Sequence, residues 1–86
     1  MDYRIQIRRE AKRKLQTLPV NDRLRITDKI LALGRDPDDV TLDVKPLTDS
    51  RFWRLRVGHW RIIYDRQDTL RIIAVEHIRS RGDVYK

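Results

Sequence analysis

The sequence from Phe52 to Tyr64 reads F-W-R-L-R-V-G-H-W-R-I-I-Y and predicts a β-hairpin. Two runs of alternating side chains flank Gly58-His59, and glycine readily adopts the backbone angles that a two-residue hairpin turn requires. Successive side chains in a strand point to opposite faces, so the hairpin has an apolar face and a basic face. The apolar face is predicted to carry Trp53, Leu55, Val57, Trp60, Ile62 and Tyr64, and the basic face Arg54, Arg56 and Arg61.

The basic face is costly for folding alone. With Gly58-His59 as the turn, Arg56 lies opposite Arg61, and like charges that face each other across a sheet repel. A bound anion would remove this cost. The hairpin therefore predicts a phosphate-binding surface.

The composition is that of a small basic globular domain. The 86 residues include 20 Lys and Arg against 13 Asp and Glu, a formal charge of +7, which favours a polyanionic partner over a merely solvated basic surface. The absence of Cys excludes disulfides and thiolate metal sites. Because no membrane-length apolar segment or signal peptide is present, we expect one cytoplasmic domain over residues 1–86, without membrane association.

The rest of the chain predicts an α+β fold with the order β-α-α-β-β-β. Its sheet is small and antiparallel-dominated, and a helical hairpin covers one face and leaves the basic face open. The expected elements outside the Phe52–Tyr64 hairpin are a strand at Tyr3–Arg8, a helix at Arg9–Thr17, a helix from a cap at Asn21 or Asp22 to a stop at Gly34, a loop at Arg35–Ser50, and a strand at Thr69–Glu76.

Alternation also predicts which way the last strand faces. Ile73 and Val75 are expected to face the helices, which places Leu70, Ile72 and Ala74 on the basic face. A one-residue bulge would exchange the two sets, and the sequence leaves that alternative open.

Most enzyme chemistries lack support in this sequence. The two histidines, His59 and His77, do not have a metal-ligand spacing, and no glycine-rich phosphate loop precedes a helix. Ser50 and Ser80 lack the context of a nucleophile, and the Asp-rich turn from residue 36 lacks the ligand pattern of a calcium loop. We therefore expect no cofactor.

Fixed cations accompanied by Tyr85 are what remains, and such a cluster can stabilise the extra negative charge of a pentacovalent phosphate. RNA supplies its own nucleophile, the 2′-OH. Cleavage without a metal would then leave a 2′,3′-cyclic phosphate and a 5′-OH.

The runs W-R-L-R-V-G-H-W-R-I-I-Y and I-R-S-R-G-D-V-Y resemble the RelE/ParE toxin superfamily of bacterial type II toxin–antitoxin systems, and in particular its RelE-like branch. RelE-like members cut mRNA in the ribosomal A site, whereas ParE-like members poison DNA gyrase. The resemblance implies a ribosome-dependent mRNA endonuclease that inhibits translation. It also implies a cognate antitoxin as partner, the ribosome and mRNA as targets, and operator DNA as an indirect partner through the antitoxin.

The resemblance further assigns roles to residues. Arg54 and Arg56 match the basic pair that grips the RNA backbone, and Arg61 matches the phosphate-stabilising arginine. Arg81 matches the C-terminal arginine that stabilises the leaving group, and Tyr85 matches the tyrosine that orients the base. The RNA-binding set is Arg54, Arg56, Arg79 (a near substitute for Arg81) and Lys45.

The general base stays open. Many relatives have Lys in the basic pair, and Lys can lose its proton, whereas Arg effectively cannot. Ser80 also stands where many relatives have His. The conceivable bases are His59, Glu76 and Asp83. The alternatives to the nuclease are a ParE-like gyrase inhibitor without catalysis and a toxin that has lost its activity and persists as an antitoxin partner. ParE-like members usually have a less complete basic face, so the presence of Arg61, Arg81 and Tyr85 together favours the nuclease.

Overall fold

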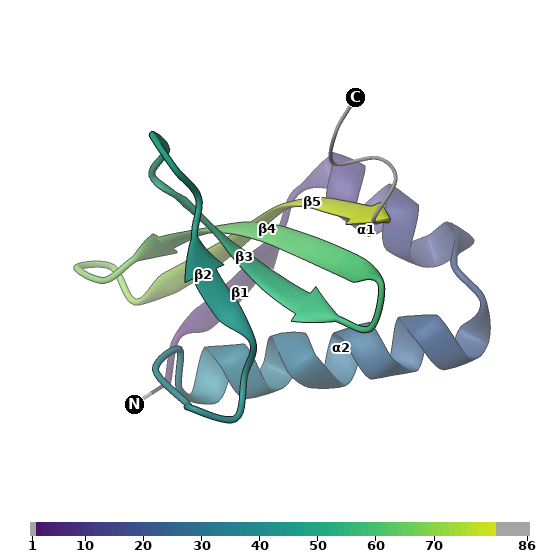
Figure 1. Cartoon of the computed structure of the whole chain (residues 1–86), viewed down its shortest axis with the longest axis horizontal. Helices are drawn as coiled ribbons and strands as arrows, with labels where there is room; N and C mark the ends of the chain where they lie inside the picture. Colours follow the sequence, from purple (N-terminus) through teal and green to yellow (C-terminus); the bar gives the residue numbers. More distant parts are fainter. Residues whose placement is uncertain (1, 81–86) are drawn as a thin grey trace.

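In the computed structural model, which describes residues 2–80, two helices pack against one five-stranded sheet (Figure 1). The strand order is β1-β5-β4-β3-β2, with β1 parallel to β5 and every other neighbouring pair antiparallel. The expected α+β fold is confirmed. The elements are β1 (Arg4–Ile7), α1 (Arg9–Thr17), α2 (Val20–Arg35), β2 (Val44–Pro46), β3 (Phe52–Val57), β4 (Trp60–Gln67) and β5 (Ile72–Ser80).

The hairpin register agrees with the sequence prediction. Arg56 pairs with Arg61, and Gly58 takes a positive φ of 60° in the turn between β3 and β4. Leu55 and Ile62, which pair on the apolar face, are completely buried.

One hydrophobic core joins both helices to the apolar face of the sheet. α1 packs against β5, while α2 runs along β1 and β3 on the same side (Figure 1). Within residues 2–80 no helix is long and apolar enough to span a membrane. The buried cluster consists of Ala11, Leu18, Ile26, Ile30, Leu33, Leu42, Leu55, Val57, Ile62, Tyr64, Ile73, Val75 and Ile78.

α2 differs from its predicted bounds at both ends. It begins at Val20 with Pro19 in the N-cap position, so neither Asn21 nor Asp22 caps it. Gly34 does not end it either, because the helix continues to Arg35. A Cβ on Gly34 would lie 2.9 Å from Cδ1 of Ile5, so this glycine allows α2 to approach β1 closely.

Strand boundaries also differ from the sequence prediction. The predicted loop at Arg35–Ser50 contains β2, a short edge strand that pairs with β3. β5 starts at Ile72 rather than Thr69, because Arg71 adopts a positive φ of 55° and donates its N–H to the carbonyl of Asp68 in a turn. Leu70 therefore lies exposed in the turn and does not share the arginine-bearing face of the sheet.

A β-bulge divides β5 into two halves. Tyr64 pairs with Val75, but the preceding residue on β4, Ile63, pairs with His77, which leaves Glu76 as an extra residue. Ile73 and Val75 lie in the core, as predicted, since the bulge follows them. Beyond it, Ile78 enters the core, and its neighbours on either side turn to the opposite face.

Candidate functional site

The face of the sheet that points away from the helices is rich in arginine, and we call it the arginine face. Three arginines form a row across three adjacent strands, because Arg61 of β4 pairs with Arg56 of β3 on one side and with Arg79 of β5 on the other. The next row contains Lys45, Arg54, Ile63 and His77. The structure thus brings together five of the residues that the sequence nominated: Lys45, Arg54, Arg56, Arg61 and Arg79.

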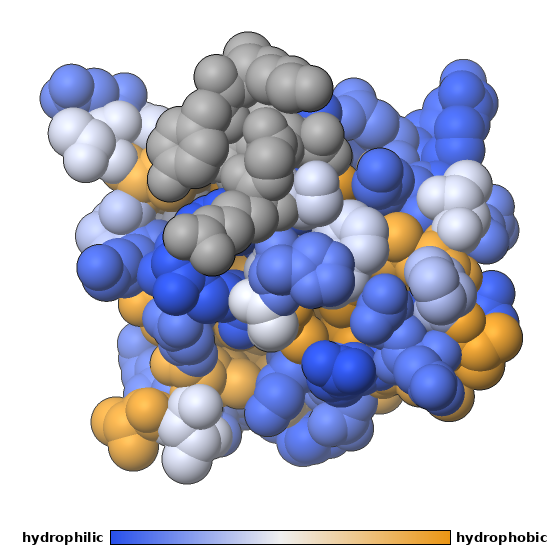
Figure 2. Space-filling view, turned by 45° about the vertical axis from the view of Figure 1, so that its right-hand side comes forward, coloured by the Kyte–Doolittle hydropathy of each residue, from blue (hydrophilic) through white to orange (hydrophobic). Residues whose placement is uncertain are grey.

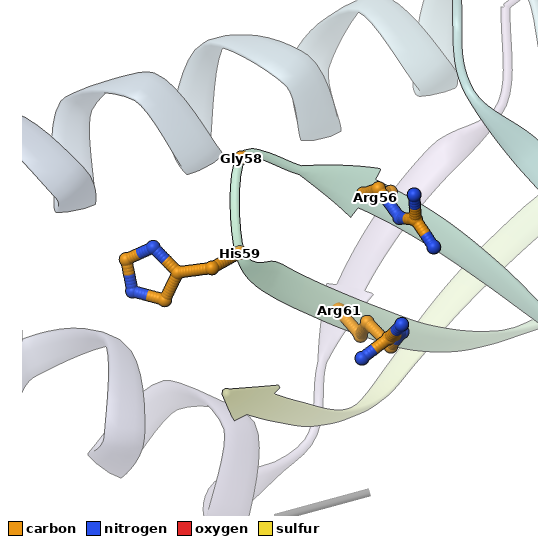
Figure 3. A pocket seen from close by; sticks show the side chains of 4 residues that line it. All are labelled: Arg56, Gly58, His59 and Arg61. Carbon is orange, nitrogen blue, oxygen red and sulfur yellow. The ribbon is translucent and has the colours of Figure 1, made fainter. Parts of the chain in front are cut away.

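The hairpin end of the arginine face is hollowed. Arg56, Gly58, His59 and Arg61 line a pocket of about 270 Å³. The side chains of Arg56 and Arg61 extend to the same side of the hairpin, whereas the His59 ring points away from them (Figure 3). The two guanidinium groups can therefore act on one anion from neighbouring strands.

Burial strengthens the electrostatic effect of this face. Arg61 and Arg54 are only 9% and 7% exposed. An arginine keeps its charge in a protein, and a charge with little water around it attracts a nearby phosphate more strongly than a solvated one does. Arg56, with a side chain 48% exposed, is the most accessible of the three to an incoming ligand.

Asp43 lies at the edge of the arginine face next to β3. Its carboxylate is 3.3 Å from Nη2 of Arg54 and 4.0 Å from Nε of Arg56. Within the described residues, Nη1 of Arg54 is buried without a hydrogen-bond partner. A buried donor without a partner costs about 1–3 kcal/mol, so the face favours an added acceptor near Arg54.

Glu10 reaches the opposite edge from the first turn of α1. Its Oε1 lies 2.9 Å from Nδ1 of His77 and 3.3 Å from Nη2 of Arg79. The Arg79 nitrogen is also 3.3 Å from Nδ1 of His77. One carboxylate oxygen therefore serves two donors, which fixes the positions of both side chains relative to the arginine row.

The described base candidates make other contacts, although His59 also lines the pocket. His59 contacts the Trp60 ring, with centroids 4.9 Å apart, and Glu76 accepts a hydrogen bond from Nε of Arg8 at 3.3 Å. Asp83, like the nominated Arg81 and Tyr85, lies outside residues 2–80. Burial raises the pKa of Tyr64 to about 12, so its phenol stays protonated near neutral pH. Tyr64 is a residue of the hydrophobic core.

Sequence reasoning missed His77 because the predicted strand ended at Glu76, and strict alternation continued beyond Val75 would point His77 into the core. The bulge at Glu76 reverses this orientation, and nothing in the local sequence marks that residue as an insertion.

Within residues 2–80 no group of three or more His, Asp or Glu residues could hold a metal ion. When the right-hand side of Figure 1 is turned forward, the surface is mostly hydrophilic (Figure 2).

Comparison with known proteins places the chain in a family. The sequence profile of the ParE toxin of type II toxin–antitoxin systems, parDE, matches residues 5–85. The chain belongs to the RelE/ParE toxin superfamily. No curated protein sequence matches this toxin significantly.

Solved structures share the fold over almost the whole toxin. The archaeal RelE–RelB complex from Pyrococcus horikoshii OT3 matches with a TM-score of 0.82 and 27% identity, covering 95% of this chain and 98% of that one. The RelBE2 toxin–antitoxin complex from Mycobacterium tuberculosis matches with a TM-score of 0.82 and 23% identity, covering 96% and 95%. A mutant of the E. coli toxin RelE in the free state matches with a TM-score of 0.77 and 16% identity, covering 99% and 92%. These likenesses support the RelE-like branch.

Proposed function

We propose that this toxin is a metal-independent endoribonuclease that cuts mRNA on the ribosome and thereby inhibits translation. The observation that carries the proposal is the row Arg56–Arg61–Arg79, in which three fixed cations from adjacent strands share one face. A sheet that served folding alone would gain nothing from such a row, since like charges on neighbouring strands repel. A phosphodiester would turn this repulsion into attraction.

The chemistry follows from what arginine can do. The 2′-OH of the substrate attacks the adjacent phosphorus in line, and the products carry a 2′,3′-cyclic phosphate and a 5′-OH. Arg61 and Arg56 stabilise the charge that develops on the phosphoryl oxygens. Arg79, the near substitute for Arg81, pairs with Arg61 and stabilises the leaving oxygen together with Arg81.

The edge of the arginine face guides the RNA backbone. Lys45 and Arg54 pair across β2 and β3, in the row next to the central one. Lys45 is exposed and suits a direct phosphate contact. Arg54 is buried and forms an ion pair with Asp43, so it contributes mainly its positive charge. Arg81 and Tyr85 keep their proposed roles in leaving-group stabilisation and base orientation.

The cellular partners follow from the superfamily. We expect a cognate antitoxin, because solved relatives include RelE–RelB and RelBE2 toxin–antitoxin complexes. We expect this antitoxin to connect the toxin indirectly to operator DNA. The ribosome and mRNA are both cytoplasmic, so the toxin would act in the cytoplasm.

A ParE-like gyrase inhibitor is the rival proposal, because the matching profile carries the ParE name. The decisive experiment expresses the toxin and maps mRNA ends by primer extension on a translated message, with EDTA-resistant cleavage measured on purified ribosome complexes. Arg61→Ala should abolish cleavage. Arg35→Ala, which removes the same charge from the exposed end of α2, should not. Intact mRNA together with trapped gyrase–DNA breaks would replace the nuclease by the gyrase proposal.

A further inference from the structure

Glu10 and His77 form a carboxylate–imidazole pair at the edge of the arginine face. The 2.9 Å contact joins Oε1 of Glu10 to Nδ1 of His77, and a carboxylate accepts hydrogen bonds, so the proton belongs on Nδ1. Arg79 then donates to the same carboxylate oxygen, 3.3 Å away, rather than to the protonated Nδ1. In the neutral imidazole, this arrangement favours the tautomer that leaves a lone pair on Nε2.

The position of His77 in the sheet is close to the phosphate-binding groups. His77 pairs with Ile63 and is thus the diagonal neighbour of Arg61, and such neighbours lie about 7–8 Å apart across a sheet. Its side chain is 38% exposed, so a ligand can reach it. In the described part of the chain, the side-chain hydrogen bonds of His77 involve only Nδ1.

The bulge is what makes this placement possible. If Glu76 occupied a regular position in the ladder, alternation from the buried Val75 would turn both His77 and Arg79 into the core. Bulges are frequent next to active sites, where they redirect side chains. Here one bulge delivers an imidazole and an arginine to the same side as Arg61.

We propose that His77 is the general base of RNA cleavage and that Glu10 is the residue that positions it. This inference rests on the proposed endonuclease function. Nε2 of His77 takes the proton of the 2′-OH while the O2′–P bond forms and the P–O5′ bond breaks. The departing 5′ oxygen takes a proton from water, and the imidazolium later returns its proton to solvent. Arginine cannot perform this transfer because it stays protonated.

Within residues 2–80, three side chains face His77. Glu10 faces it from α1, Arg79 from its own strand, and the apolar Ile63 from β4. A purely structural His77 would tie α1 to β5 through the same Glu10 contact. The two roles differ in whether the imidazole exchanges a proton during the reaction.

The test compares wild type with His77→Asn in single-turnover cleavage of mRNA on programmed ribosomes. Asn keeps an N–H that can donate to Glu10 but has no basic nitrogen. We expect the rate to fall by about 10²–10⁴-fold, the usual contribution of a general base, with an unchanged melting temperature.

Two further measurements separate proton transfer from structure. Added imidazole should restore cleavage to His77→Ala if a base is what the variant lacks. In ¹⁵N NMR spectra of the wild-type toxin, the imidazole proton should reside on Nδ1, and Glu10→Gln should increase the other tautomer. Arg35→Ala again serves as the control for a lost surface group.

The outcomes distinguish this inference from the proposed function. Normal cleavage by His77→Asn, in a preparation in which Arg61→Ala is inactive, would overturn the role of His77 and leave the nuclease standing. Absence of rescue by imidazole in a folded His77→Ala protein would also overturn it. Absence of cleavage by the wild type itself would overturn both.

Discussion

Deleting a single residue, Glu76 or His77, tests the bulge and the site together. Residues Ile72–Val75 and His77–Ser80 already pair with consecutive residues of β4, and only Glu76 has no place in that ladder. Deletion of Glu76 therefore leaves every remaining pair intact and keeps His77 opposite Ile63. Deletion of His77 also produces a regular strand, but it places Glu76 opposite Ile63.

The stability change should be small for both deletions. Removing Glu76 loses its 3.3 Å ion pair with Arg8, whose side chain is 53% exposed, and such pairs contribute about 0.2–1 kcal/mol. A regular ladder can regain a hydrogen bond worth about 0.5–1.5 kcal/mol. The net change in the free energy of unfolding should lie within about 1 kcal/mol, which corresponds to about 4–8 °C in melting temperature for a domain of this size.

The two deletions should differ in activity. The Glu76-deleted toxin keeps His77 and Arg79 on the arginine face and should cleave translated mRNA, whereas the His77-deleted toxin should be inactive although folded. Thermal unfolding by circular dichroism and primer extension give the two readings. A loss of more than about 3 kcal/mol on deleting Glu76, three times the expected limit, would show that the bulge is required for folding and refute the register argument. Equal activity of the two deletions would refute the role of His77.

Two other predictions concern the frame that supports the site. Gly34→Ala should lower the melting temperature, because overpacking against Ile5 costs about 1–3 kcal/mol and outweighs the gain of about 1 kcal/mol from helix propensity. Adding Ile5→Val, which removes the atom 2.9 Å away, should restore part of the lost stability in thermal unfolding. A higher melting temperature for Gly34→Ala alone would contradict the contact. Arg66 lowers the pKa values of Asp38 and Asp68 below the usual 3.8, so the stability that the two carboxylates contribute is complete above about pH 4 and is lost as the pH falls through the lowered values. The melting temperature should therefore decline less steeply from pH 6 to 2 in Arg66→Met than in the wild type. Parallel profiles of the two proteins would contradict this coupling.

The hairpin was predictable because its signals are local. Gly58 marks the turn, and the alternation on either side fixes which side chains share a face, so the pairing of Arg56 with Arg61 follows from the sequence. The bounds of α1 were predictable for the same reason, since its apolar positions repeat at helical spacing and Pro19 follows shortly after it.

Other features depend on contacts between distant segments. Gly34 suggests a helix end, but its role is set by Ile5, which lies 29 residues earlier in the chain. The bulge at Glu76 arises where β5 extends beyond its parallel partner, because β1 pairs only as far as Val75. Single-sequence patterns contain neither fact. The proposed base His77 was missed for this reason, because the sequence alone does not show that Glu10 and Arg79 lie next to it.

The two acidic residues at the edges of the arginine face explain how such a face can fold before any anion binds. Asp43 contacts Arg54 and Arg56 at one edge, and Glu10 contacts Arg79 at the other. Each carboxylate offsets part of the repulsion within the row and holds the flanking guanidinium groups in place. Because the charges are oriented before the substrate arrives, little reorganisation is needed when negative charge develops on the phosphate. A phosphodiester must also compete with these carboxylates for the arginine side chains. RNA that the ribosome holds in position competes better than free RNA, because its local concentration at the arginine face is higher.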